Sequence, residues 1–380
     1  WTFDTSTNQA TDGNWTIKLS YYDNGWGFYS ITAGSGDLDL TDFERDTGIK
    51  ITRCDSYSRG KAFSGKSNIK SLKAPDIVSV GYSEFWRCSA ITNIYLPSAI
   101  TFGEYAFNEC KELVSLTISS EAKTFSKHFA KANAKMVSLT PTEFPNLTKI
   151  GDSAFYGCSR LEVSLSLPNL TTIDTHAFYN CSKFRGIYFP KLTTLGRQAF
   201  CYTLSLEKLS PLFPDTLASI SGDSLFFRNS VSRKFVQEEP LRIANPNITV
   251  IGEYFMDGVA DFTMPFDFYS PIATIQKYAF TALPKGQIVN FYSDVVPTFA
   301  ASAMHTAGKG RIVFYIHSQK AISAWKERCE ALAETFESSK TASDYPGKRT
   351  IGLVDCSGGS GTYAWVVSAT EGAGTTMIIK

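Results

Sequence analysis

Residues 150–170 read IGDSAFYGCSRLEVSLSLPNL, and residues 173–192 then read IDTHAFYNCSKFRGIYFPKL. Both stretches carry an isoleucine, an Ala-Phe pair, a cysteine and a proline in the same order. Phe155, Phe178 and Phe200 follow one another after 23 and 22 residues. Self-similarity at a fixed period of this size is typical of solenoid proteins, in which each unit contacts only its neighbours. This stretch therefore decides the fold.

The same pattern extends in both directions. Towards the N-terminus it recurs as FGEYAFNECKELVSLTI at residues 102–118 and VGYSEFWRCSAITNIYL at residues 80–96. In a less regular copy, the Ala-Phe pair is inverted to Phe129-Ala130. Beyond residue 200 the copies are looser, and residues 227–247 insert extra sequence. We count about ten copies between residues 51 and 300, which is enough to bury a continuous core.

Each copy contains a short segment with the alternation of a β-strand. In Gly186-Ile187-Tyr188-Phe189 polar and apolar side chains alternate, and a proline follows, which cannot donate to a strand ladder. We expect one short parallel strand for each repeat of about 22–23 residues, with the Ala-Phe segment as a turn or short helix on the opposite side. The predicted fold class is an α/β, right-handed solenoid.

Two columns of side chains are expected to fill its interior. The phenylalanines of the Ala-Phe segments form the predicted core spine, which comprises Phe63, Phe85, Phe107, Phe155, Phe178, Phe200 and Phe280. A small residue before each Phe lets neighbouring coils approach. A second column holds Cys88, Cys110, Cys158 and Cys181. A buried, unpaired thiol that acts as a small filler is the favoured interpretation, and a disulfide or a metal between neighbouring copies is the alternative. The remaining Cys54, Cys201, Cys329 and Cys356 fall outside this register.

The ends of the chain differ from the repeats. In WTIKLSYYDNGWGFYSIT, two strands are predicted around Asp23-Asn24-Gly25, which is a hairpin signal. The stretch SQKAISAWKERCEALAETFE has helical spacing of Ile322, Trp325, Cys329, Leu332 and Phe336. We therefore expect four regions: an N-terminal β cap over 1–50, repeats over 51–317, a C-terminal capping helix over 318–345 and a strand-rich tail over 346–380. We expect the tail either to form a small sheet or to pair with a partner.

The motif carried by IGDSAFYGCSRL at residues 150–161 and FGEYAFNECKEL at residues 102–113 resembles the BspA type of leucine-rich repeat. The resemblance covers roughly residues 51–340. It implies a leucine-rich-repeat solenoid of a bacterial cell-surface or secreted family, whose members are linked to adhesion and host-protein binding. It does not identify a ligand, because function does not follow from fold.

Composition and motifs exclude several classes of function. The 37 Lys and Arg and 36 Asp and Glu give a net charge of +1, which does not favour nucleic acid. No apolar run has the length of a transmembrane helix. The four histidines are scattered, and no phosphate loop, zinc-protease or nucleophile-elbow motif occurs. We therefore expect no enzyme activity, no catalytic or metal-binding residues and no cofactor. Because the chain begins with Trp1, we expect a processed product whose signal peptide or lipid anchor has been removed.

The remaining candidate site is the outward face of the strands. By alternation it is predicted to comprise Asn93, Tyr95, Ser115, Thr117, Ser138, Thr140, Ser164, Ser166, Tyr188, Lys208, Ser210, Asp261 and Thr263. Strand spacing places Tyr95 and Tyr188, four copies apart, at about 19 Å from each other. Tyrosine is a common anchor at interfaces, whereas Ser and Thr also occur simply because they suit strands.

Three functions remain open at this point. The first is an extracellular or cell-surface scaffold that binds a protein or a glycan, in adhesion or host interaction, as a monomer. The second is a structural spacer or surface-layer component. The third is an enzyme accessory domain with a site in the terminal regions, near residues 227–247 or 296–380.

Overall fold

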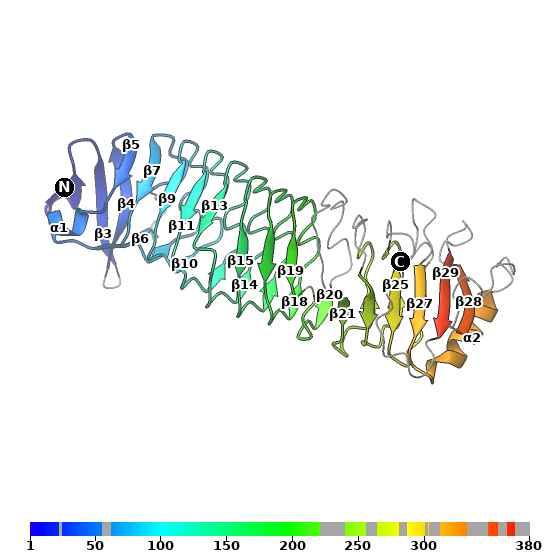
Figure 1. Ribbon diagram of the computed structural model, residues 1–380. Coiled ribbons are helices and arrows are strands. Elements are labelled where there is room, and N and C mark those ends of the chain that lie inside the picture. The colour runs from blue at the N-terminus through cyan, green and yellow to red at the C-terminus, as the bar shows by residue number, and fades with distance from the viewer. Residues whose placement is uncertain are drawn as a thin grey trace. The chain divides into compact units, whose positions relative to one another are not determined.

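The computed structural model describes residues 1–22, 25–54, 62–211, 213–220, 240–255, 264–280, 287–300, 303, 312–332, 349–355 and 363–368. The chain divides into two compact units, Trp1–Pro211 (unit 1) and Leu212–Lys380 (unit 2). Figure 1 shows the strands of unit 1 following one another in chain order. The predicted parallel-strand solenoid is confirmed. Asp23, Asn24, Asp261, Thr263, Phe336 and Cys356 lie outside the described residues.

The first strands of unit 1 pair antiparallel. They are β1 (Thr2–Asp4), β2 (Gln9–Thr11), β3 (Thr16–Tyr22) and β4 (Gly25–Ala33), and β3 and β4 form the predicted hairpin. A short helix, α1 (Phe43–Thr47), follows and ends at Gly48. Trp15 is buried beneath this sheet and donates from Nε1 to the carbonyl oxygen of Asp37 at 2.8 Å. The ring of Phe28 in β4 packs against Phe63, the first residue of the spine, with 4.8 Å between ring centroids.

The predicted strand of each repeat is present, and the strands pair in parallel. The first ladder contains β5 (Gly36–Asp39), β7 (Ile69–Lys73), β9 (Asn93–Tyr95), β11 (Ser115–Thr117) and β13 (Ser138–Thr140). A second ladder contains β15 (Ser164–Ser166), β17 (Gly186–Tyr188) and β19 (Lys208–Ser210). Between the ladders, only an isolated bridge joins Glu143 to Ser166, because the repeat that contains β13 is longer than its neighbours.

Each repeat also contributes a second, very short strand that the sequence did not predict. In unit 1 these strands are β6 (Ile51–Cys54), β8 (Ser79–Val80), β10 (Thr101–Phe102), β12 (Thr124–Phe125), β14 (Lys149–Ile150), β16 (Thr172–Ile173) and β18 (Thr194–Leu195). They pair in parallel with the equivalent strands of neighbouring repeats. A Cβ atom on Gly103, just after β10, would lie 2.4 Å from the Tyr82 nitrogen. The glycine of the motif is therefore explained by the close approach of two backbones.

The Ala-Phe segments form turns rather than helices in residues 62–211. Each turn contains two residues with positive φ four positions apart, for example His176 at 56° and Asn180 at 57°. This backbone directs alternate N–H groups to the next repeat: His176, Phe178 and Asn180 donate to carbonyl oxygens of residues 197, 199 and 201 at 2.8–2.9 Å. The left-handed conformation costs free energy at non-glycine residues, and these hydrogen bonds between repeats offset that cost.

The predicted phenylalanine spine is confirmed. Its seven members are completely buried. Phe155 and Phe178 stack with 5.3 Å between ring centroids, and Phe178 and Phe200 stack at 5.5 Å. In the inverted copy, the ring of Phe129 enters the core from the alanine position and contacts Phe107 and Phe155 at 5.3 and 5.7 Å. The core therefore tolerates the inversion because the aromatic volume is kept.

The cysteine column consists of free, buried thiols, which confirms the favoured interpretation. Each Sγ donates to a backbone carbonyl oxygen of the preceding repeat: Cys88 to Phe63, Cys110 to Phe85, Cys158 to Ala130 and Cys181 to Phe155, at 2.9–3.1 Å. Cys54 and Cys201 are also free and buried. The thiol thus satisfies a buried carbonyl group in addition to filling space.

Unit 2 continues the pattern of two strands per repeat. Its main strands are β21 (Leu241–Ile243), β23 (Phe266–Phe268), β25 (Ile288–Phe291) and β27 (Ile312–Ile316), and its short strands are β20 (Ser219–Ile220), β22 (Val250–Ile251), β24 (Thr274–Ile275) and β26 (Thr298–Phe299). Helix α2 (Ala321–Leu332) begins after Ser318, whose Oγ accepts from the Ala321 nitrogen at 3.3 Å. Trp325 of α2 is buried against Phe291, Phe299 and Phe314.

The tail contributes two strands to unit 2. Strand β29 (Tyr363–Ser368) pairs in parallel with β27, and β28 (Arg349–Asp355) pairs antiparallel with β29. Of the two alternatives for the tail, the structure therefore has the sheet, formed by extension of the main ladder.

Candidate functional site

The outward strand face of unit 1 holds the predicted residues in register. Asn93, Ser115 and Ser138 are direct neighbours across β9, β11 and β13, and Tyr95, Thr117 and Thr140 form the adjacent row. In the second ladder, Ser164, Gly186 and Lys208 form one row, while Ser166, Tyr188 and Ser210 form the other. The period of two along a strand puts all of them on one face.

This face is polar and has few large side chains. Tyr95 and Tyr188 are 42% and 44% exposed, and the Ser115 hydroxyl donates to Asn93 Oδ1 at 2.6 Å. Close packing limits one position, because a Cβ on Gly186 would lie 2.6 Å from the Lys208 carbonyl oxygen. The face of unit 1 therefore offers hydroxyl groups and two separated tyrosines.

In unit 2 the strand face is built from residues that the sequence did not identify. The expected strand around Asp261 and Thr263 lies outside the described residues, and the strand of this repeat is β23. Its neighbours place Arg242, Asp267 and Asn290 in one row. Polar and apolar residues alternate in LRI at 241–243, FDF at 266–268 and VNF at 289–291, which is the pattern of a strand with one outward face. The stretch ADFTM at 260–264 alternates in the same way, so the sequence does not distinguish it from FDF.

A hydrogen-bonded chain joins two of these residues, Asp267 and Asn290, to His317. Asn290 donates from Nδ2 to Asp267 Oδ1 at 2.6 Å, and its Oδ1 lies 3.0 Å from Nε2 of His317, which directly follows β27. The Nε2–H tautomer of His317 satisfies this contact. A carboxylate, an amide and an imidazole from three successive repeats are therefore fixed relative to one another.

An aromatic column runs beside this chain. The rings of Tyr269 and Tyr292 stack at 4.2 Å, and those of Tyr292 and His317 stack at 4.1 Å. At the other end, the Arg242 guanidinium lies 4.9 Å from the Tyr269 ring centroid and forms an ion pair with Asp215 at 3.5 Å. Tyr269 is 42% exposed. We call Arg242, Asp267, Tyr269, Asn290, Tyr292 and His317 the polar patch.

The electrostatics of the polar patch differ from those of a solvated strand face. Burial raises the pKa of the Asp267 carboxyl, although the hydrogen bond from Asn290 and the charge of Arg242 act in the opposite direction. Burial, together with the Asp267 charge and Tyr269, raises the pKa of the Tyr292 hydroxyl. Perturbed acidic groups beside a specific polar network are typical of functional sites.

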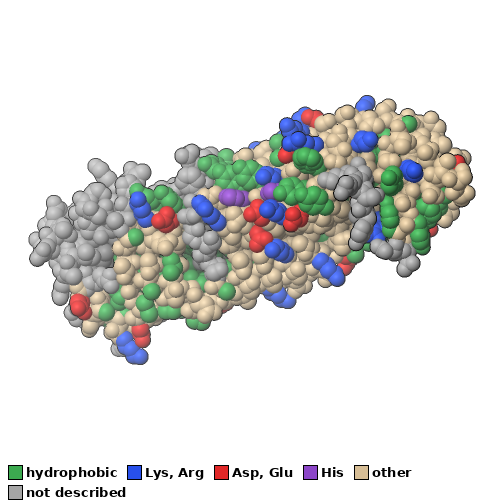
Figure 2. Space-filling view, turned by 180° about the vertical axis from the view of Figure 1, so that it is seen from behind, with side chains coloured by type: hydrophobic (Ala, Val, Ile, Leu, Met, Phe, Trp, Pro, Cys, Tyr) green, Lys and Arg blue, Asp and Glu red, His purple; other side chains and the backbone are tan. Residues whose placement is uncertain are grey.

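The turns of unit 1 carry a second surface that the sequence did not predict. Aromatic side chains of successive turns contact one another, and they comprise Tyr82, Tyr105, His128, Tyr156, His176, Tyr179 and Tyr202. Figure 2 shows hydrophobic and histidine side chains gathered on this side among charged side chains of both signs. The two histidines lie at equivalent turn positions, and burial followed by the Lys131 charge lowers the pKa of His128. Tyr82 is 59% exposed.

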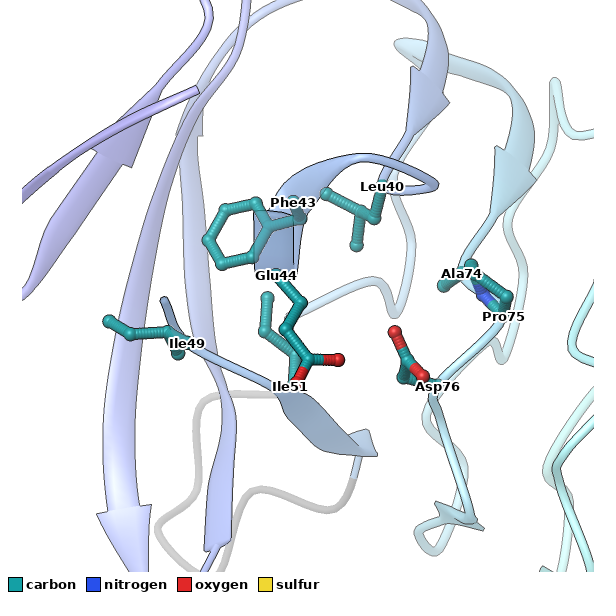
Figure 3. A pocket seen from close by; sticks show the side chains of 8 residues that line it. All are labelled: Leu40, Phe43, Glu44, Ile49, Ile51, Ala74, Pro75 and Asp76. Carbon is teal, nitrogen blue, oxygen red and sulfur yellow. The ribbon is translucent and has the colours of Figure 1, made fainter. Parts of the chain in front are cut away.

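A small pocket lies near α1 in unit 1. Apolar side chains line it together with the carboxylates of Glu44 and Asp76 (Figure 3). Lys50 Nζ lies 3.2 Å from Glu44 and 2.9 Å from Asp76, and these contacts raise the pKa of Lys50. The two carboxylates are therefore ion-paired rather than arranged as an acid and a base.

No group of three or more His, Cys, Asp or Glu side chains is placed to hold a metal ion among the described residues. None of the described helices has the length and apolar character needed to cross a membrane.

The repeats match a known family. A BspA type leucine-rich repeat region matches residues 57–162 and 129–233, with six copies. No curated protein shows significant sequence similarity to the chain. These matches identify the repeat, whereas they leave its ligand open.

Similar folds occur among solved structures. A leucine-rich repeat protein of T. pallidum is 18% identical, with 52% of this chain and 90% of that chain covered and a TM-score of 0.43. The pneumococcal vaccine antigen PcpA is 14% identical, with coverages of 84% and 96% and a TM-score of 0.39. A leucine-rich repeat protein of Bacteroides ovatus is 16% identical, with coverages of 80% and 70% and a TM-score of 0.42. By the motif, the strand ladders and the family match, residues 57–233 of the chain belong to the BspA type of leucine-rich repeat.

Proposed function

We propose that the chain is a non-enzymatic binding scaffold, exported to the cell surface, that recognises an extracellular protein or a glycan through the outward strand face. The observation that supports this is the register of that face. Equivalent side chains of successive repeats stand beside one another over β7, β9, β11 and β13. A repeated, rigid row of this kind suits a broad and shallow ligand.

The face also has a composition that suits recognition. Tyr95 and Tyr188 are the exposed aromatic side chains of the predicted set in unit 1, and tyrosine loses little conformational entropy when it becomes an anchor. The hydroxyl groups of Ser115, Thr117 and Ser138 on the same face can each donate and accept hydrogen bonds. Alternating buried positions such as Leu116, which is 0% exposed, hold the face rigid from beneath.

A binding screen tests the proposal. The purified chain would be measured against immobilised fibronectin, laminin and collagen and against an oligosaccharide array. A variant with Tyr95→Ser and Tyr188→Ser would be compared with Tyr82→Ser, which changes an exposed tyrosine on the turn side. All variants should keep the parental melting curve, since exposed substitutions change stability by about 0.5 kcal/mol or less.

The result of the screen decides between the hypotheses. Binding by the parent chain that the double variant loses, and that Tyr82→Ser keeps, supports a site on the strand face of unit 1. Binding that the double variant retains moves the site away from these tyrosines. Absence of binding to every probe contradicts the binding role and favours a structural spacer.

A further inference from the structure

The polar patch of unit 2 buries a charged side chain, which costs free energy that the pairing of the strands does not require. At equivalent outward positions in unit 1, the strands carry the neutral Ser115, Ser138 and Ser164, and the charged residues of these rows, Asp37 and Lys208, are exposed. In unit 2 a carboxylate, Asp267, takes this place and is half-buried, and its burial disfavours the charged form. The neighbouring strands pair through backbone hydrogen bonds, which do not need this charge. Side chains that break a local rule without benefit to stability point to a functional site.

The aromatic column limits what the polar patch can bind. The ring faces of Tyr292 are covered by Tyr269 on one side and by His317 on the other, and Arg242 lies over the Tyr269 ring. The column therefore presents ring edges and polar atoms to solvent rather than open apolar faces. The covered faces of Tyr292 therefore cannot receive the hydrophobic anchor of a protein partner.

The polar atoms of Asp267 and Asn290 can form hydrogen bonds with the hydroxyl groups of a ligand. Asp267 provides a carboxylate acceptor whose Oδ1 is already held by Asn290, which leaves Oδ2 for a ligand. Asn290 retains a second N–H on Nδ2, since its first bonds Asp267. A hydroxyl both donates and accepts, so adjacent hydroxyls can donate to Asp267 and accept from Asn290.

The balance of charge favours a neutral ligand. The polar patch contains one carboxylate, Asp267, and one guanidinium, Arg242, which is itself paired with Asp215. A polyanion would be repelled by both carboxylates, and a cationic peptide would meet the Arg242 charge. A neutral, hydroxyl-rich molecule avoids both penalties.

We propose that the polar patch of unit 2 binds a neutral saccharide, with Asp267 and Asn290 as its hydrogen-bonding residues and Tyr269 as the exposed edge of the site. The inference rests on the proposed scaffold function and names the class of ligand for its strand face. Asn290 is fixed between Asp267 and His317, so the donors and acceptors are oriented before the ligand arrives.

The experiment uses the full chain and an array of neutral oligosaccharides of glucose, galactose, mannose and N-acetylglucosamine, followed by calorimetric titration of the best binder. The test variants are Asp267→Asn and Asn290→Ala. The control is Tyr82→Ser, an exposed residue on the turn side of unit 1. We expect Asp267→Asn to weaken the affinity about tenfold or more, because a hydrogen bond to a charged group is lost. The control should bind like the parent.

Three results overturn the inference. In the first, no neutral oligosaccharide binds the parent chain. In the second, Asp267→Asn and Asn290→Ala bind as the parent does. In the third, binding is confined to sulfated or uronic-acid glycans added to the same array.

Failure of the wider function gives a different pattern. If the parent binds a matrix protein through Tyr95 and Tyr188 but no oligosaccharide, the scaffold function holds and the saccharide site is wrong. If neither protein nor oligosaccharide binds, both proposals fail together.

Discussion

Asn133 donates from Nδ2 to the carbonyl oxygen of Phe107 at 2.9 Å, at the position where neighbouring repeats place Cys110 and Cys158. An amide thus replaces a thiol in the column and makes the same bond to the preceding repeat. The carbonyl oxygen, rather than the cysteine, is what the column must satisfy. The cysteine column is therefore a row of hydrogen-bond donors, in which most donors are cysteine thiols and one is the amide of Asn133.

This relationship predicts different outcomes for two substitutions. Asn133→Ala leaves the Phe107 carbonyl without its donor and should lower the free energy of unfolding by about 1–3 kcal/mol. Asn133→Cys restores the donor and removes Asn133 Oδ1, which is buried without a partner among the described residues. It should be as stable as the parent. Urea denaturation followed by circular dichroism measures both, and equal losses would show that the hydrogen bond is unimportant.

The two faces of one repeat predict a second contrast. Phe178→Ala removes a ring that is 0% exposed and stacks on two neighbouring rings, and it should destabilise the chain by about 3–5 kcal/mol. Tyr188→Ala, whose side chain is 44% exposed, should change stability by about 0.5 kcal/mol or less. Thermal melts of both variants test the assignment of inward and outward positions, which equal shifts would contradict.

The buried thiols predict chemical inertness in the native state. Burial raises the pKa of Cys158 to about 12, and it raises the pKa values of Cys110 and Cys181 as well. At pH 8 these thiols are protonated and shielded, so iodoacetamide should not modify them in the folded chain. In urea all three should react. Peptide mass mapping locates the labels, and rapid native labelling of Cys158 would place it on the surface.

Asp267 predicts a dependence of stability on pH. Because its pKa in the folded chain is raised above the ordinary value of 3.8, the contribution of Asp267 to stability is greatest below that pH and falls as the pH rises through the folded pKa. Asp267→Asn removes this loss and keeps an oxygen to accept from Asn290. Its melting temperature should therefore exceed that of the parent at pH 7, by a few degrees at most.

The same comparison at acidic pH provides the control for that prediction. Near pH 3.5 the two proteins should melt together, because Asp267 is then protonated in the folded parent. If Asp267→Asn is less stable than the parent at pH 7, the carboxylate stabilises the fold. The free-energy cost of burying Asp267 would then no longer support a role in ligand binding.

The sequence was informative where a pattern repeats and weak where it does not. The position of Phe178 in the spine and of Tyr188 on the outer face follows from spacing and alternation alone, because each inward side chain has equivalents in neighbouring copies. The short strand β10 could not be predicted, since the two residues Thr101 and Phe102 are too few to show a period. Such two-residue strands form because a parallel partner in a neighbouring repeat stands beside them, as β8 does beside β10.

In unit 2, the sequence could not identify the strand because two neighbouring stretches both alternate. Both ADFTM at 260–264 and PFDFY at 265–269 alternate, so periodicity alone allows either to be the strand, and the choice shifts every outward residue. Pairing of Phe266 with Leu241 and Val289 on the two neighbouring strands decides it. The contact between Asp267 and Asn290 follows from that choice.

By itself, the sequence determined the repeat, the buried spine and the outward face of unit 1, because these depend on local spacing that recurs in every copy. Tertiary structure decided which residues meet between repeats. It set the close approach at Gly103, the donor role of the cysteine column, the addition of β29 to β27 and the chain from Asp267 through Asn290 to His317. These contacts join residues 21 or more positions apart, and only the register of stacked coils brings such residues together.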